Sequence, residues 1–378
     1  MENLTFVEVS KDALTNNIKQ FRKIVGDKVK LCPCVKSNAY GHGLVQSAKI
    51  FLEAGADLLS VNALYEAKIL RENNIFAPIY VMGYISLADL KEAVEMDVSM
   101  VVYNYETIDL LSAIASKINK IPRVHIKVET GNNRQGVPLN DIVNFAQYIK
   151  KQGNIFIEGL STHFANIEDT TDHTFAFLQL SNFKKAISDL QLANIEIPIK
   201  HCANSAATIL FKETHFDMVR IGISSYGMWS SNETLVSYSK NAAQDFALTP
   251  ALTWKAKVVQ VKDVDEGEYI GYGCTYKTDK KSKIAIIPVG YYDGYDRGIN
   301  NAYVLIHGKR APVRGRICMN MFMADITNIY DVKIEDEVVL IGRDKDEVIS
   351  AETFAKWAGT INYEATTRIN ERIPRVVL

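Results

Sequence analysis

The sequence has no excess of charge of either sign: 43 lysines and arginines face 44 aspartates and glutamates over 378 residues. The basic residues are scattered, and no basic stripe of the kind that follows a phosphate backbone is present. We therefore expect no nucleic-acid partner. Long apolar runs are also missing, because none approaches the roughly 18 residues that a membrane-spanning helix needs. We expect no membrane partner either.

Cysteine is scarce, with five residues in the chain. An odd and small number predicts reduced thiols rather than a disulfide framework. The first residues, MENLTFVEVSKDAL, lack the basic and apolar regions of a secretory signal. Cys32-Pro33-Cys34 does not have the spacing of a zinc or thioredoxin site. These features together predict a cytoplasmic protein.

What is present is a regular alternation of short β-branched runs and longer segments with helical periodicity, from residue 11 to about 225. Eight strands are predicted: KVKLCPCVK (28–36), DLLSV (57–61), PIYVMG (78–83), SMVVYN (99–104), RVHIKVET (123–130), IFIEGLSTHF (155–164), IPIKHCANS (197–205) and MVRIGISSYG (218–227). Parallel strands need crossover helices, and eight such units suit closure into a (β/α)8 TIM barrel. An open doubly wound sheet is disfavoured, because no G-x-G-x-x-G turn follows any strand.

After about residue 241 the pattern changes to strands joined by glycine-containing and charged turns, with one clear helix at AETFAKWAGTI (351–361). The sequence therefore predicts an α/β chain with two domains. Residues 1–240 form the barrel, and residues 241–378 form a mainly β C-terminal domain.

Polar side chains gather where the predicted barrel strands end, which is where the active sites of such barrels lie. They include Lys36, Asn62, Asn104, the segment 127–134, His163, Asn204, Ser205 and Arg220. Lys36 opens the sequence KSNAYGHG, whose glycines allow tight turns. A P-loop is excluded, because it needs glycines just upstream of its Lys-Ser pair and the nearest is Gly26. A strand-end lysine in a pocket suits Schiff-base chemistry, although one at the surface would simply be solvated.

VKSNAYGHG resembles the cofactor-lysine motif of the alanine racemases, which are fold-type III pyridoxal-phosphate enzymes. Other segments resemble the same family in the same order: IKVETGNNRQG, STHFANIED, HCANSAA, VRIGISSYG, GYGCTY, PVGYYDGYDRG, GRICMNM and TINYEATTRI. The resemblance extends along nearly the whole chain. It implies an isomerase that interconverts L- and D-alanine, works as a homodimer with shared sites, and binds pyridoxal 5'-phosphate. Supply of D-alanine for peptidoglycan and breakdown of alanine both stay open as its role.

The resemblance also implies how the cofactor is held. Lys36 would bind it covalently, and Arg220 would face its ring nitrogen. The remaining cofactor residues would be Tyr40, Asn204, Ser205, Gly222, Ile223 and Tyr363. Ser205 could instead serve as an ordinary helix N-cap.

Two bases would flank the substrate by the same resemblance: Lys36 and Tyr272 of the partner subunit. His163 and Arg220 would activate the tyrosine. Arg134 and Met319 would contact the substrate, and Lys127 would be carbamylated so that it orients Arg134. Tyr291, Arg297 and Arg316 would line the entrance.

Three positions depart from the family pattern: Asn132 and Asn133, where the family usually has Met-Gly, and Asn320, where it has aspartate. They leave open a racemase of serine or of a broader range of amino acids. A barrel metal hydrolase is a remoter alternative, using a carbamylated Lys127 with His163, His201 and the cluster of Asp169, Asp172 and His173, but no H-x-H lies on the first strand. A non-catalytic pyridoxal-phosphate carrier is a third, disfavoured because such carriers lack the β domain.

Overall fold

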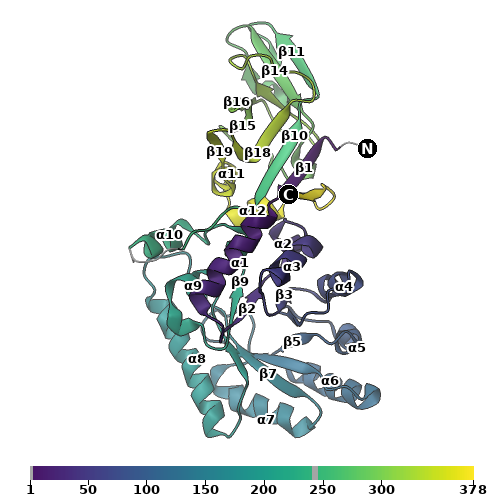
Figure 1. Cartoon of the computed structure of the whole chain (residues 1–378), viewed down its shortest axis with the longest axis vertical. Helices are drawn as coiled ribbons and strands as arrows, with labels where there is room; N and C mark the ends of the chain where they lie inside the picture. The colour runs from purple at the N-terminus through teal and green to yellow at the C-terminus, as the bar shows by residue number, and fades with distance from the viewer. Residues whose placement is uncertain (1–2, 241–245) are drawn as a thin grey trace. The chain divides into compact units, whose positions relative to one another are not determined.

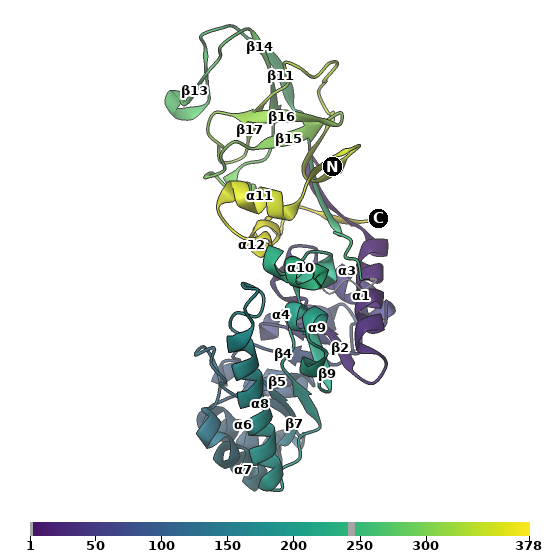
Figure 2. The same ribbon diagram turned by 90° about the vertical axis from the view of Figure 1, so that its left-hand side faces the viewer.

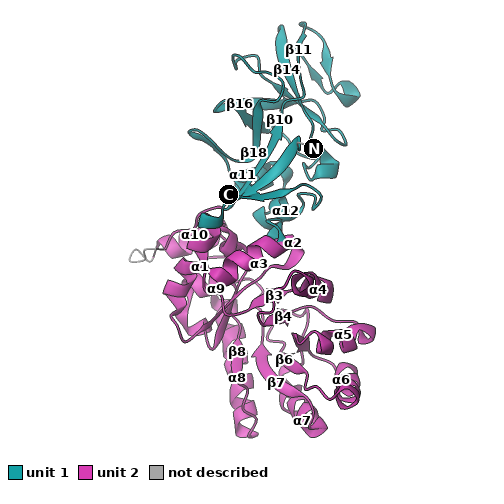
Figure 3. Ribbon diagram, turned by 45° about the vertical axis from the view of Figure 1, so that its right-hand side comes forward, with its two compact units in different colours: residues 1–12, 40–43, 251–378 teal, residues 13–39, 44–250 magenta. Residues whose placement is uncertain are grey.

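The structure is a computed structural model that describes residues 3–240 and 246–378. The chain forms two compact units (Figure 3). Unit 1 contains residues 1–12, 40–43 and 251–378, and unit 2 contains residues 13–39 and 44–250. The predicted domain boundary between residues 240 and 241 falls at the edge of 241–245, which lie outside the described residues. It stays a prediction.

Unit 2 is built on eight parallel strands (Figure 1). They are β2 (Lys30–Pro33), β3 (Leu59–Val61), β4 (Ile79–Val81), β5 (Ser99–Val102), β6 (Arg123–Lys127), β7 (Phe156–Ser161), β8 (Ile199–His201) and β9 (Met218–Ile221). Strands β3 to β8 pair in sequence order, and β2 pairs with β9. A bridge between Cys34 and Ser60 joins β2 to β3. Hydrogen bonds from Asp217 N to Lys200 O and from Arg220 N to Ala203 O join β9 to the β8 side. The predicted (β/α)8 barrel is confirmed.

Helices cover the outside of this barrel, so the outward-facing side chains of its strands are buried. They are α1 (Lys11–Val25), α3 (Leu44–Glu53), α4 (Leu64–Glu72), α5 (Leu90–Glu95), α6 (Tyr105–Ile118), α7 (Ile142–Gln152), α8 (Thr174–Leu192), α9 (Ser205–Leu210) and α10 (Asn232–Ser239). Helix α7 packs on β7 and against α8 (Figure 2). In the described part of the chain, no helix combines the length and the apolar character needed to cross a membrane.

Unit 1 is mostly strands, as predicted for the C-terminal domain. Its main sheet has the order β11-β14-β17-β16-β15-β18-β10-β1-β20, with β19 paired to β18, and β12 and β13 form a separate hairpin. The strands are β1 (Thr5–Val9), β10 (Leu252–Lys257), β11 (Gln260–Val264), β12 (Tyr269–Ile270), β13 (Tyr276–Lys277), β14 (Ser282–Ile287), β15 (Tyr303–Ile306), β16 (Lys309–Arg314), β17 (Phe322–Asp325), β18 (Glu337–Asp344), β19 (Glu347–Ile349) and β20 (Arg375–Val377). Its core is aromatic, with Tyr295 stacked on Phe322 at 4.6 Å between ring centroids.

Two features of unit 1 were not predicted. Strand β1 comes from the N-terminus and pairs with both β10 and β20. The predicted helix at 351–361 is present as α11 (Ala351–Ala358), but a second helix, α12 (Asn362–Thr367), follows it. Helix α12 carries Tyr363, so this short helix positions one of the predicted cofactor residues.

Candidate active site

Lys36 lies at the start of a left-handed turn that follows β2. Ser37, Asn38 and Ala39 have φ angles of 54°, 53° and 53°, and this segment is labelled α2 (Lys36–Tyr40). Left-handed helical backbone costs roughly 1–2 kcal/mol per residue for residues with a Cβ. The surrounding structure must therefore hold the turn in place, and it fixes the backbone on which Lys36 sits.

Glu66 on α4 supplies part of that support. Its carboxylate is buried, at 2% exposure. One oxygen accepts the Ser37 N–H at 2.6 Å, and the other accepts the N–H groups of Asn62 and Ala63 at 2.8 and 3.0 Å. A single carboxylate thus ties the end of β3 to the turn beside Lys36. This positioning residue was not predicted from the sequence.

Four basic groups of unit 2, Lys36, Lys127, Arg134 and Arg220, lie close enough to His163 to act on its pKa. Burial, together with Arg220 and Arg134, holds the pKa of Lys127 well below its ordinary range. Burial also holds the pKa of His163 well below its ordinary range, and Lys127, Arg220, Arg134 and Lys36 lower it further. The structure therefore brings together the barrel residues that were predicted to act as base, anchor and substrate ligand. Such a concentration of positive charge suits anionic ligands.

A shallow depression beside this basic cluster is lined by Lys127, Glu129, Arg134 and His163, among others. The loop that carries Arg134 is shaped by Glu129. Burial would raise the pKa of this carboxyl, but backbone N–H groups of residues 131–134 bind it and the pKa is lowered overall. The carboxylate accepts the Gly131 N–H at 2.6 Å. Glu129 therefore fixes the backbone that presents Arg134.

The two asparagines that depart from the family pattern have local explanations in this loop. Asn133 adopts a φ of 53°, a left-handed conformation that glycine adopts freely and that asparagine tolerates better than most residues. Asn132 donates from Nδ2 to the carbonyls of His163 and Phe164, at 3.4 and 3.5 Å. The side chain of Asn132 thus supports the loop backbone, and Asn133 occupies a left-handed position in it. Asn320 lies in an exposed turn closed by the Cys318 N–H to Met321 O bond, where asparagine and aspartate are both favoured.

Arg220 on β9 is buried, and its guanidinium is held by three acceptors. Nη1 donates to His201 Nδ1 at 2.6 Å, and Nη2 donates to the carbonyls of Thr162 and Cys202 at 2.9 and 3.3 Å. A guanidinium has more N–H donors than these bonds use. Arg220 is therefore fixed in orientation while retaining the capacity to bind a ligand.

His201 also bears on the metal-hydrolase alternative. Its second ring nitrogen, Nε2, bonds to His125 Nδ1 at 2.8 Å, so both nitrogens have protein partners. Within residues 3–240 and 246–378, no group of three histidine, cysteine or acidic side chains is placed to hold a metal ion. His201 cannot act as the metal ligand which that alternative requires.

The predicted phosphate-binding residues fall into two groups, one in each unit. In unit 2, Ser205 Oγ accepts the Gly222 N–H at 3.0 Å. The N-cap of α9 is Asn204, which accepts the Ala207 N–H at 3.0 Å, so the alternative role of Ser205 as N-cap is wrong. In unit 1, the rings of Tyr40 and Tyr363 lie 6.1 Å apart.

Tyr272 lies on an exposed turn of unit 1, where 66% of its surface is open to solvent. Gly271 and Gly273 flank it with φ angles of 76° and 72°. A Cβ at residue 273 would come within 3.1 Å of the Arg316 guanidinium carbon. Glycine at 273 therefore lets Arg316 pack directly against the turn that carries the predicted base.

The other predicted substrate and entrance residues of unit 1 are neighbours. Arg297 lies over the Tyr291 ring at 5.7 Å and donates to Ile317 O at 2.7 Å. Tyr291 N–H donates to Cys318 O at 3.1 Å. Met319 follows directly and is exposed. One segment, 316–319, thus links these residues to the turn of Tyr272.

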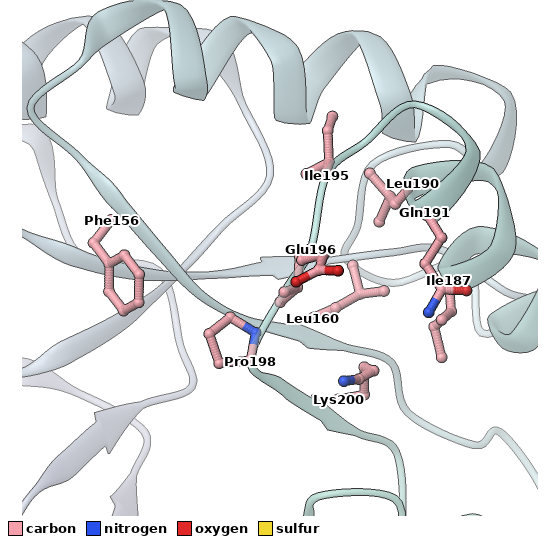
Figure 4. Close-up of a pocket in the computed structure, with 10 residues that line it drawn as sticks. Phe156, Leu160, Ile187, Leu190, Gln191, Ile195, Glu196, Pro198 and Lys200 are labelled. Carbon is pink, nitrogen blue, oxygen red and sulfur yellow. The ribbon is translucent and has the colours of Figure 1, made fainter.

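A second hollow of unit 2 lies elsewhere. A groove of about 620 Å³ is lined by β7, α8 and the segment before β8, with Phe156, Leu160, Ile187 and Lys200 on its walls (Figure 4). Phe156 begins β7, so the groove includes the amino end of that strand. Its lining contains none of the predicted site residues.

Comparison with known proteins agrees with the geometry. The family described as "Alanine racemase, N-terminal domain" matches residues 9–229, and "Alanine racemase, C-terminal domain" matches residues 251–377. The chain belongs to the alanine racemase family. Proteins named alanine racemase from Methanococcus maripaludis and Halothermothrix orenii are 44% and 42% identical to it, over 99% and 98% of this chain and 98% and 96% of theirs.

Solved alanine racemases have the same fold. A crystal structure of alanine racemase from Bacillus anthracis with bound L-Ala-P has a TM-score of 0.93 at 36% identity, covering all of this chain and 96% of that one. Alanine racemase from a D-cycloserine-producing Streptomyces lavendulae has a TM-score of 0.92 at 32% identity, with 100% and 98% coverage. The family assignment and the enzyme class, an isomerase, are confirmed. The metal-hydrolase alternative is wrong. The alternative of a non-catalytic pyridoxal-phosphate carrier is also wrong, because such carriers lack the domain that matches residues 251–377.

Proposed function

We propose that this alanine racemase family member interconverts L- and D-alanine with pyridoxal 5'-phosphate bound to Lys36. The observation that carries the proposal is the buried Arg220, held by His201 and two carbonyls beside Lys127 and His163. A cation at this position cannot accept a proton from a ring nitrogen. Arg220 therefore leaves the ring nitrogen unprotonated and the ring a weaker electron acceptor. This favours return of a proton to the α-carbon, which is racemisation, over side reactions such as transamination.

The residues present suit this cofactor. The cations Arg134 and Arg220, beside Lys36 and His163, fit a ligand that carries an anionic phenolic oxygen. Lys36 supplies the amine for covalent attachment. We assign the phosphate to Ser205, to the backbone N–H groups of Gly222 and Ile223, to Asn204 nearby, and to the hydroxyls of Tyr40 and Tyr363.

When bound, pyridoxal phosphate withdraws electrons from the attached amino acid and makes its α-hydrogen acidic. The residues of the chain do the rest. Lys36 takes the α-proton of the D-isomer, and Tyr272 of the partner subunit takes that of the L-isomer from the opposite face. His163 is uncharged because its pKa is depressed, so we assign the charge that stabilises an ionised Tyr272 to Arg220. Arg134 and Met319 hold the substrate, and Tyr291, Arg297 and Arg316 line its approach.

Alanine is the favoured substrate over serine or larger amino acids. The amide of Asn132 is already bonded to backbone carbonyls, and Asn133 serves a left-handed position. Neither of these two departures from the family pattern needs a polar substrate side chain to explain it. Five free thiols support a cytoplasmic location as part of the same proposal.

The proposal is tested by purifying the protein with pyridoxal phosphate and recording its visible absorption. Loss of optical rotation is then followed with L-alanine and, separately, with L-serine. We expect a coloured protein that racemises L-alanine faster than L-serine. A colourless protein that never retains the cofactor would refute the proposal, and faster turnover of L-serine would refute the substrate assignment.

The shared site of the proposed homodimer predicts complementation between two inactive variants. Lys36→Ala and Tyr272→Phe each remove one base, but a mixed dimer has one site with both bases intact. Mixing the two proteins under conditions that exchange subunits should restore up to about half of the activity per mixed dimer, since one of its two sites is intact. Tagged subunits verify exchange by co-purification. Exchange without recovery of activity would contradict the assignment of Tyr272 to the partner's site.

Carbamylation of Lys127 is a further prediction. Its depressed pKa leaves the amine neutral at lower pH than an ordinary lysine, and a neutral amine adds to CO2 by forming an N–C bond and releasing a proton. Below the unfolded pKa of about 10.4 a depressed lysine pKa opposes folding, so carbamylation stabilises the fold. We expect ¹³C-bicarbonate to give a carbamate NMR signal and to raise the melting temperature. Both effects should vanish in Lys127→Ala and persist in Lys200→Ala, a lysine paired with Asp217 at 3.1 Å. A signal that survives Lys127→Ala would contradict the assignment.

A further inference from the structure

A line of hydrogen-bonded side chains runs through unit 2 from Arg220. His201 Nδ1 accepts from Arg220 Nη1 at 2.6 Å, and His201 Nε2 lies 2.8 Å from His125 Nδ1. His125 Nε2 lies 3.0 Å from Glu158 Oε2. Glu158 also accepts from Ser99 Oγ. We call Glu158, His125 and His201 the relay.

The relay has one consistent order of protons. Arginine only donates, so His201 must present a lone pair at Nδ1 and carry its proton on Nε2. That N–H then donates a hydrogen bond to His125 Nδ1, and His125 carries its own proton on Nε2 toward Glu158. The carboxylate at the far end accepts the hydrogen bond from this last N–H and stays ionised. The cation at one end of the line, Arg220, and the anion at the other, Glu158, thus select one tautomer of each histidine.

Burial keeps the relay in this state. Both rings are buried, and desolvation lowers the pKa of His125 and holds that of His201 well below its ordinary range. Burial opposes ionisation of Glu158, but its bonds to His125 and Ser99, with the charge of Arg123, lower its pKa to about 2. Arg123 Nε lies 3.8 Å from Glu158 Oε1, and Arg123 Nη2 lies 3.1 Å from Asp97 Oδ1. The two histidines are therefore neutral and the terminal carboxyl is ionised.

The barrel backbone is adapted to His125. A Cβ on Gly159 would come within 2.1 Å of His125 Nδ1, so only glycine leaves room for the ring. The φ of Gly159 is not in the left-handed region, which means that space and not backbone conformation requires the glycine. Tyr80 stacks on the His125 ring, with 4.5 Å between the ring centroids. His125 is thus packed against both Tyr80 and the backbone of Gly159.

The relay spans the barrel from one end of its strands to the other. Side chains of a strand alternate between its faces, so Arg123, His125 and Lys127 on β6 point to the same side at three successive levels. Arg123 is the first residue of the strand and Lys127 the last. Glu158 contacts Ser99 and Arg123, the first residues of β5 and β6, so it acts from the end of the strands opposite to the one where Lys127 and Lys36 lie.

We propose that Glu158, His125 and His201 are positioning residues for racemisation, because they orient Arg220 by fixing the tautomer that faces it. The proposal rests on the proposed function, in which Arg220 faces the ring nitrogen of the cofactor. If His201 presented an N–H at Nδ1, two donors would oppose each other and Arg220 would leave its position. The relay therefore sets the direction of the Arg220 guanidinium from a carboxylate that never touches cofactor or substrate.

The test uses full-length protein labelled with ¹⁵N in its seven histidines. Imidazole ¹⁵N shifts distinguish protonated from unprotonated ring nitrogens. In the wild-type protein, His201 and His125 should both carry their proton on Nε2. Glu158→Gln keeps the shape but can turn an amide N–H toward His125, so the single tautomer should be lost. Racemisation should fall by about 10- to 100-fold, the usual effect of removing a supporting hydrogen-bond partner.

Gly159→Ala provides an independent variant that changes no hydrogen-bonding group. It should displace His125 and cause a similar loss of racemisation, with altered His125 signals. His215→Asn is the matched control, because His215 is also buried but bonds to Thr208 O at 2.9 Å, outside the relay. It should leave the signals of His125 and His201 unchanged.

The outcomes separate the two proposals. A wild-type protein that neither binds pyridoxal phosphate nor racemises alanine refutes the proposed function. An active wild-type protein in which His201 carries its proton on Nδ1 overturns the relay, as does full activity in Glu158→Gln. Melting temperatures show whether any variant is unfolded, and the isosteric Glu158→Gln decides the question if Gly159→Ala does not fold.

Discussion

Tyr272→Phe should abolish exchange of the α-hydrogen of L-alanine with solvent while leaving that of D-alanine. The proposed bases act on opposite faces, so removing the tyrosine hydroxyl leaves Lys36 able to take and return the proton of the D-isomer. Racemisation in either direction needs both bases and should fall by about 10²- to 10⁴-fold. Proton NMR in D₂O, started separately from each isomer, measures the exchange.

Tyr269→Phe is the matched control for this experiment. Tyr269 lies in the same hairpin region, is exposed and stacks with the Lys277 ammonium at 5.5 Å. Its change should leave both exchange rates as in the wild-type protein. Equal loss of exchange from L- and D-alanine in Tyr272→Phe would contradict the assignment of one base to each face.

Arg220→Glu should lower racemisation by about 10²- to 10³-fold, the scale of losing a preorganised electrostatic group. A carboxylate can share a proton with the ring nitrogen of the cofactor, which strengthens the ring as an electron acceptor and promotes transamination. Alanine would then transfer its amino group to the cofactor and leave as pyruvate, at most one molecule per site, which a coupled dehydrogenase assay detects. The substitution also removes a cation that depresses the pKa of Lys127, so the carbamate signal should weaken.

Arg220→Lys separates charge from geometry. A lysine keeps the positive charge but cannot reproduce the planar set of bonds to His201 Nδ1, Thr162 O and Cys202 O. It should lose activity without producing pyruvate. Equal amounts of pyruvate from both variants would show that the charge at residue 220 does not govern the side reaction.

The barrel could be predicted because each of its strands and helices is encoded by a short, continuous stretch of sequence. Each of the eight strands β2–β9 coincides with a β-branched run read from the sequence, and each is followed by a helical segment. Since the carboxyl ends of parallel strands share one face, listing the residues at those ends was enough to bring Lys36, Lys127, His163 and Arg220 into one group. Their roles came from the family resemblance and not from the pattern.

The supporting residues could not be predicted in this way. His125 and His201 are 76 residues apart in sequence, and nothing in RVHIK distinguishes a ring that bonds to another histidine from one that is merely buried. Alternation along β6 does place Arg123, His125 and Lys127 on one side, which is the one signal that was available. Glu66 had a similar weak signal, as an acidic residue in the first turn of α4, yet its bond to Ser37 depends on a left-handed turn that no propensity predicts.

Unit 1 is made of separate segments of the chain, which limits where the protein can be cut into fragments. Strand β1 at the N-terminus lies between β10 and β20, and residues 40–43 belong to the same unit although both flanking segments belong to unit 2. A fragment ending at residue 250 would keep β1 but lose both of the strands that pair with it. The exposed strand edge would favour self-association. The two halves are thus not interchangeable modules: recombination between relatives at a single crossover after residue 250 would join a β1 from one parent to a sheet from the other, and the two would have to be compatible.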